Sequence, residues 1–137
     1  MDRVAIIVDK SLNNGEVANV AAILMGQLAL SYLPVYSNEC IIDKSGFQHS
    51  GIKCNTVVLK TNKTKLMKFC TSISDADYQK QIITIIFTKE GQSLNNRFEE
   101  YMRIIKSNSL FDLHPVGVAL AGKEHIIRNL TSKFSLY

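Results

Sequence analysis

The sequence predicts a three-layer α/β domain with a largely parallel or mixed sheet. Short apolar runs rich in β-branched residues alternate along the chain with segments whose apolar residues recur at helical spacing. The chain has 137 residues, the length of one ordinary domain, so we expect a single domain over residues 1–137. With 46% hydrophobic and 20% charged residues the composition is near the globular norm, and only seven glycines and two prolines exclude collagen-like and low-complexity chains.

The chain opens with the pattern of a strand, a loop and a helix. Residues 4–8 are a continuous apolar run, which is typical of a strand covered on both faces. After a polar loop, Asn13 and Glu16 have the spacing of a capping box at a helix start. The helix is expected to run to about Leu33, where Pro34 ends it.

No charged residue occurs between Val17 and Asn38, and this stretch is long enough to span a bilayer. It contains polar residues, among them Asn19 and Gln27, and many of its other side chains are the small ones of alanine. We therefore interpret it as a helix buried against the sheet rather than a membrane span.

The middle of the chain predicts a hairpin or edge excursion, then a strand and a helix. Residues 43–46, Asp-Lys-Ser-Gly, are a turn signal within the excursion at 39–55. A strand over 56–60 and a helix over 63–73 follow, because the apolar residues change from a continuous run to helical spacing.

The second half repeats the alternation, and its strongest strand is rich in β-branched residues. The final strand has room for a close contact at Gly117. We expect polar loops at 75–80 and 88–95, strands at 82–87 and 116–121, helices at 96–107 and 123–131, and a short tail to Tyr137.

Ligands of open α/β sheets bind outside the carboxyl ends of the strands. That rule nominates the loops at 9–16, 60–64, 88–95 and 122–124. The candidate catalytic residues there are Asp9, Glu16 and Thr88, and the candidate ligand-binding residues are Asn19, Gln92, Ser93 and Lys123. Structural alternatives stay open: Asn19 as a buried amide bonded to backbone, Asp9 as a solvated turn or cap acid, Thr88 with Gln92 and Ser93 as caps of the helix expected from residue 96, and Lys123 as an exposed lysine.

Charge and cysteine content limit which partners and which cell compartment the sequence predicts. The formal net charge is +4, and Lys60, Lys63, Lys65 and Lys68 lie close together, so nucleic-acid binding is expected to be weak or absent. Three cysteines without a C-x-x-C pair, and no histidine at ligand spacing, indicate reduced thiols of a cytoplasmic protein. We expect no metal and no cofactor.

The order of the motifs resembles the family called domain of unknown function 2000. The resemblance is carried by residues 4–9 with Gly15 and Ala18-Asn19, by Phe87-Thr88 with Gln92-Ser93, and by residues 117–120 with Asn129-Leu130-Thr131. That family is similar in fold to type II peptidyl-tRNA hydrolases. The resemblance therefore implies a three-layer α/β/α sandwich with a mixed, mostly parallel four-stranded sheet, commonly dimeric.

The resemblance to those hydrolases fails at the positions to which chemistry is assigned. They have a lysine where this chain has Glu16, a glutamine where it has Val20, and an aspartate where it has Thr88. We therefore expect a module that binds a small ligand or a partner in a polar cleft at the strand ends. The alternative is a hydrolase of ester bonds, similar to peptidyl-tRNA hydrolase, with altered catalytic residues.

The uncharged first helix and the apolar helix at 96–107 offer more apolar surface than one small sheet can cover. We therefore expect a homodimer.

Overall fold

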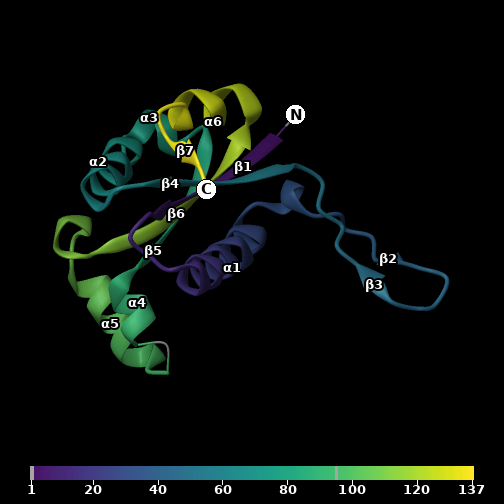
Figure 1. The fold of residues 1–137 in the computed structure, drawn as a ribbon, viewed down its shortest axis with the longest axis horizontal. Coiled ribbons are helices and arrows are strands. Elements are labelled where there is room, and N and C mark those ends of the chain that lie inside the picture. Colours follow the sequence, from purple (N-terminus) through teal and green to yellow (C-terminus); the bar gives the residue numbers. More distant parts are fainter. Residues whose placement is uncertain (1, 95) are drawn as a thin grey trace.

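A five-stranded sheet forms the centre of the molecule in the computed structural model, which describes residues 2–94 and 96–137 (Figure 1). The strands are β1 (Asp2–Asp9), β4 (Asn55–Thr61), β5 (Ile82–Thr88), β6 (Pro115–Lys123) and β7 (Ser135–Leu136). Their order across the sheet is β5-β6-β1-β4-β7. The sequence implied four strands; the fifth is the expected tail, whose residues 135 and 136 pair with β4.

The sheet is mixed, and its neighbouring pairs are mostly antiparallel. β1 pairs in parallel with β4, whereas β6 lies antiparallel between β5 and β1, and β7 is antiparallel to β4. The expectation of a mostly parallel sheet was therefore wrong at the level of pairing, because β6 inserts between two strands that share a direction. β1, β4 and β5 nevertheless all run the same way.

Helices cover both faces of the sheet, as the three-layer prediction requires (Figure 1). α1 (Asn14–Ser31) packs its buried Val17, Val20, Leu24 and Leu28 on one face. α2 (Lys63–Ile73) and α6 (Glu124–Thr131) cover the other face. Successive residues of β1 alternate between the two layers, so Ile6 belongs to the α1 side and Ile7 to the α2 side.

The close contact expected at Gly117 is present. A Cβ atom placed on this glycine would lie 2.8 Å from Val20 Cγ1 and 2.9 Å from Leu24 Cδ1. Both side chains are fully buried in α1, so they have no free space into which to move. Gly117 therefore sets how closely α1 approaches β6.

Two segments expected as loops contain short helices. α3 (Ala76–Gln79) begins after Asp75, whose side chain accepts from Asp77 N–H, and α4 (Lys89–Ser93) begins after Thr88. Helix α5 (Phe98–Ser107) follows, and short 3₁₀ turns lie at Leu33–Val35 and Leu110–Asp112. The residues that cap α3 and α4, Asp75 and Thr88, are polar, which is why the sequence resembles a loop at both places.

The excursion is a hairpin of β2 (Ile41–Ile42) and β3 (Gln48–His49) that projects away from the sheet (Figure 1). Gly46 has a φ of 91° in its turn, a conformation that favours glycine. The apolar side chains of this hairpin are exposed, including Ile42 and Phe47.

None of the helices in the described ranges combines the length and apolarity needed to cross a membrane.

We predict opposite effects of one added methyl group at two glycines. Gly117→Ala should lower the free energy of unfolding by about 1–3 kcal/mol, because the core must shift to admit the methyl group. Gly26→Ala is the matched control: outside the adjacent backbone of α1, no described atom lies within 4 Å of its added Cβ, so α1 should gain about 0.5–1 kcal/mol. Urea unfolding measures both, and equal effects would contradict the close packing of α1 on β6.

Candidate functional site

Three strands end at one edge of the sheet, and this carboxyl edge is where the candidate residues gather. Asp9, Thr61 and Thr88 are the last residues of β1, β4 and β5, and β6 starts at the same edge with Pro115. The first three nominated loops therefore meet. The fourth, at 122–124, does not, because β6 runs antiparallel and ends at the opposite edge.

Two adjoining cavities at this edge form a cleft, and they share Glu16, Lys89 and Gln92 as a common wall. The first cavity has a volume of about 620 Å³ and lies between α1 and α4. The second has a volume of about 220 Å³. The first is lined by Asn13, Gly15, Glu16, Asn19, Ile23, Phe87, Lys89, Gly91, Gln92 and Ser93; the second by Asp9, Ser11, Leu12, Glu16, Lys63, Lys89, Gln92, His114, Pro115 and Val116.

Asp9 is the most buried charged residue of the cleft, with only 2% of its surface exposed. Its Oδ1 accepts hydrogen bonds from the backbone N–H and the hydroxyl of Ser11, both at 2.9 Å. Its Oδ2 takes no hydrogen bond from the described residues. The turn at Ser11 thus uses one oxygen and leaves the other available to the second cavity.

Glu16 lines both cavities and also caps α1. Its carboxylate accepts from Asn13 N–H at 3.1 Å, and Asn13 Oδ1 accepts from Glu16 N–H at 2.9 Å. The capping box that the sequence predicts is therefore confirmed, and it holds one carboxylate oxygen at the wall of the cleft.

Asn19 lines the first cavity but is exposed, so the expectation of a buried amide was wrong. The reason is the helical phase of α1. Val17 and Val20 point into the core, which places Asn19 on the solvent side. Gln92 and Ser93 line the same cavity from α4.

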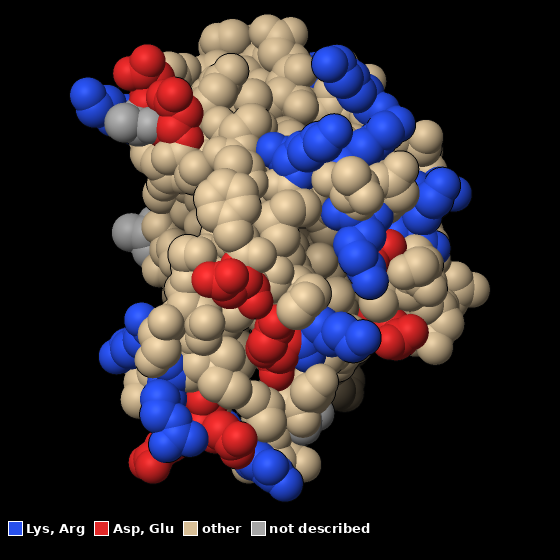
Figure 2. Space-filling view, turned by 90° about the vertical axis from the view of Figure 1, so that its left-hand side faces the viewer, with Lys and Arg blue, Asp and Glu red and all other residues tan. Residues whose placement is uncertain are grey.

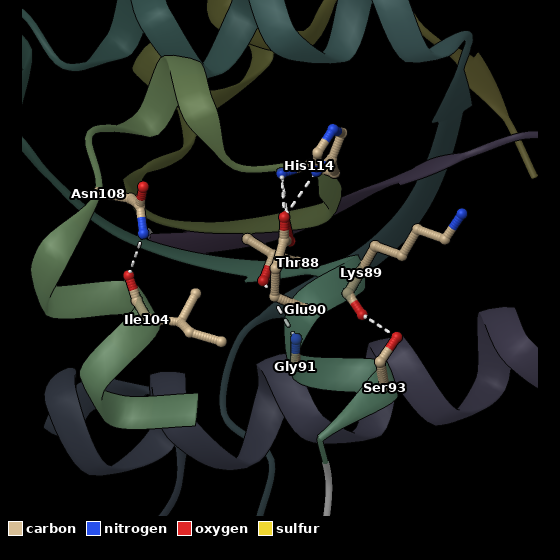
Figure 3. Close-up of polar contacts among 8 residues, drawn as sticks. All are labelled: Thr88, Lys89, Glu90, Gly91, Ser93, Ile104, Asn108 and His114. Carbon is tan, nitrogen blue, oxygen red and sulfur yellow. Dashed lines mark hydrogen bonds and ion pairs between the residues drawn. The ribbon is translucent and has the colours of Figure 1, made fainter. Parts of the chain in front are cut away.

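Thr88 serves the backbone instead of the cleft. It is 3% exposed, and its hydroxyl accepts from Gly91 N–H at 3.3 Å, which caps α4 (Figure 3). It lines neither cavity, so the structure supports the capping alternative at this position. Ser93 donates to the carbonyl of Lys89 at 3.0 Å in the same short helix.

The structure adds a pair that the sequence reasoning missed. Glu90 and His114 reach toward each other from α4 and from the segment before β6 (Figure 3). His114 Nδ1 lies 2.6 Å from Glu90 Oε1, and the His114 backbone N–H donates to both carboxylate oxygens at 3.1 and 3.3 Å. With the proton on Nδ1, the carboxylate fixes the ring and leaves Nε2 as an acceptor beside the second cavity.

The same contacts account for the ionisation of Glu90. Its partial burial opposes ionisation, but the hydrogen bonds from the His114 ring and backbone outweigh it and hold the pKa of Glu90 below its usual value. No motif links residues 24 apart, so only the antiparallel direction of β6 would have placed His114 beside α4.

Lys123 lies away from the other candidates. Its ammonium group is 3.3 Å from Asp2 Oδ1 at the opposite edge of the sheet, where Tyr32 also donates to Asp2 at 2.8 Å. The Tyr32 hydrogen bond is the main cause that lowers the pKa of Asp2. Lys123 therefore does not share the cleft with the other candidates and lines a separate cavity with Glu124, His125 and Arg128.

Metal binding has no support in the described ranges, where no three His, Cys, Asp or Glu side chains are grouped as ligands. The three cysteines are unpaired, and burial raises the pKa of the Cys70 thiol to about 12.

Comparisons with known proteins give a family and a fold. The family model described as "Protein of unknown function (DUF2000)" matches residues 2–137. The solved structure of Atu0240, a protein of unknown function from Agrobacterium tumefaciens strain C58, is 20% identical with a TM-score of 0.83. The match covers 99% of this chain and 97% of that one, and at this identity it shows the fold alone. No curated protein matches.

We predict that Glu90→Gln destabilises the fold at neutral pH and has less effect in acid. A carboxylate whose pKa is lowered by folding contributes stability above its unfolded pKa, near 4.5, and loses it as the pH falls through the lower folded value. Urea unfolding at pH 7 and below pH 4 measures this. Glu99→Gln, at an exposed position of α5, is the control. A pH-independent difference would contradict the role of the ionised pair.

Proposed function

The chain belongs to DUF2000, a family of proteins of unknown function, and we propose that it binds a small polar ligand in the cleft at the carboxyl edge of its sheet. The observation that carries this proposal is the buried carboxylate of Asp9. Asp9 Oδ2 takes no hydrogen bond from the described residues and is not fully enclosed, so it is an acceptor that a ligand donor in the second cavity can reach.

The size and lining of the cleft favour a small ligand with donors and acceptors. The first cavity, at about 620 Å³, is within the usual range for small-molecule sites. Asp9 and Glu16 offer acceptors, Lys63 and Lys89 offer donors, and the Gln92 amide offers both. Glu16 disfavours a phosphate in the cleft itself. A partner protein that inserts a polar segment would use the same groups.

We predict that Gln92→Ala weakens ligand binding about tenfold, because this side chain belongs to both cavities and its loss leaves a hydrogen bond unmade. NMR titration with a panel of amino acids, hydroxy acids and nucleosides should shift the amides of Ser11, Glu16 and Lys89. Gln27→Ala, on the exposed face of α1 outside the cleft, should leave affinity unchanged. Ligand binding in the cleft would be refuted if the compounds shift only distant amides, or if they bind Gln92→Ala as tightly as the native chain.

Hydrolysis of an ester is a second candidate, favoured by the His114–Glu90 pair. Nε2 of the fixed imidazole would take a proton from water, and the hydroxide would attack the ester carbonyl. Lys63 or Lys89 would stabilise the resulting oxyanion. Collapse breaks the carbon–oxygen bond, and the leaving alkoxide recovers the proton from His114, giving an acid and an alcohol.

The hydrolase candidate predicts cleavage of p-nitrophenyl acetate that falls about 100-fold or more in His114→Gln. His125→Gln, an exposed histidine of α6 outside the cleft, is the control and should retain the rate. We expect no meaningful turnover of peptidyl-tRNA. Equal rates in His114→Gln and His125→Gln would exclude the pair as the base. Peptidyl-tRNA turnover lost in Asn19→Ala would instead support the relationship to the hydrolases.

The homodimer and the cytoplasmic location belong to the same proposal. Leu30 at the end of α1 is 79% exposed and Phe98 at the start of α5 is 68% exposed, which supports pairing with a second copy. The free thiols support a reducing compartment.

A further inference from the structure

Beside the cleft lies a basin whose charged side chains are all lysines. Lys10, Lys60, Lys65 and Lys133 line it, and they come from the loop after β1, from β4, from α2 and from the segment after α6. Its volume is about 600 Å³, and the rest of its lining is polar: Asn14, Thr61, Asn62, Ser135 and Tyr137. No acidic side chain is among the described residues of this lining.

The basin concentrates positive charge that the protein does not neutralise. Within the described ranges, none of the four ammonium groups forms an ion pair. Basic side chains gather toward the upper right of the face in Figure 2, with few acidic ones among them. Like charges held at one site raise the local potential and attract an anion of several charges.

The unpartnered hydroxyl of a nearly buried residue provides a second, independent observation. Thr61 is 8% exposed, lines the basin, and its hydroxyl forms no hydrogen bond with the described residues. A hydroxyl in that position is a donor that a phosphate oxygen would satisfy. Beside it, Asn62 caps α2 through a 2.8 Å bond to Lys65 N–H, so the electropositive end of an eleven-residue helix opens here.

One wall of the basin is formed by Tyr137, which contacts two other residues of the lining. Tyr137 donates its hydroxyl proton to Asn14 Oδ1 at 2.9 Å, and the Lys60 ammonium lies 5.5 Å from the centre of its ring. The walls come from four segments, and the single aromatic ring is covered by Lys60. This geometry suits a compact anion better than an extended strand with stacked bases.

We propose that the basin binds the phosphate moiety of a small phosphorylated ligand. Lys10 and Thr61–Asn62 in the basin adjoin Ser11 and Lys63 in the cleft along the chain, and the proposed ligand extends from one into the other. In that respect the inference rests on the proposed function, and it names the chemical class of the ligand. The phosphate lies beside the cleft and away from the carboxylates of Asp9 and Glu16.

Calorimetry with pyrophosphate tests the basin. The double variant Lys10→Gln/Lys65→Gln should bind pyrophosphate at least about tenfold more weakly than the native chain. The control Lys44→Gln/Lys106→Gln makes the same change in net charge, also at one loop and one helix position, outside the basin. Equal losses in the two double variants, or no binding by the native chain at millimolar pyrophosphate, would overturn the proposal.

Two further arms separate the alternatives. Thr61→Val keeps the charge and the shape, so a several-fold loss with this variant marks a built site and no loss contradicts one. A twelve-nucleotide RNA that binds more tightly than pyrophosphate, with a steeper salt dependence, would overturn the small ligand in favour of a polynucleotide. Pyrophosphate binding reports on the basin, whereas the titration of Gln92→Ala with phosphate-free polar compounds reports on the cleft, so failure of the cleft and failure of the basin give different results.

Discussion

Burial of the two central strands on both faces is the constraint on which this structure depends. Residues 4–9 of β1 and 115–122 of β6 are all buried. Such strands must be covered by helices above and below, and their small residues decide how near those helices come. The approach of α1 at Gly117 then determines where its first turn, with the Asn13–Glu16 cap, stands relative to the end of β1.

The direction of β6 distributes the functional groups between the two edges. Since it runs against β1 and β5, its first residues join the carboxyl edge and its last residues leave it. His114 thereby meets Glu90, and Lys123 meets Asp2 instead. The antiparallel direction of β6 therefore explains why the sequence did not predict the contact of His114 with Glu90, and why Lys123 lies away from the cleft.

Local patterns predicted local structure well and tertiary relations poorly. The helix over 63–73, the capping box at Asn13 and the strand over 82–87 depend on neighbouring residues, and each is present. The fifth strand was not predicted because its two residues are too few to show the alternation of apolar and polar side chains that marks a strand. The buried alternative for Asn19 failed because its neighbours in the sequence are apolar, so the sequence alone did not show which side of α1 faces the sheet. Thr88 was offered as a cap of the helix expected from residue 96, but it caps α4, which was expected to be part of a loop.

The walls of the basin differ in stability, because one of them is formed by the short strand β7 and the residue that follows it. Only Ser135 and Leu136 are registered with β4, with one further bond from Tyr137 N–H to the Val58 carbonyl, whereas β1 and β4 pair over seven residues. Few hydrogen bonds hold an outer strand of this kind, so it opens by local fraying while the rest of the sheet stays intact. Opening removes Ser135 and Tyr137 from the basin wall. Whatever occupies the basin is thereby coupled to the order of the last residues of the chain, and slow amide exchange there becomes a reporter of occupancy.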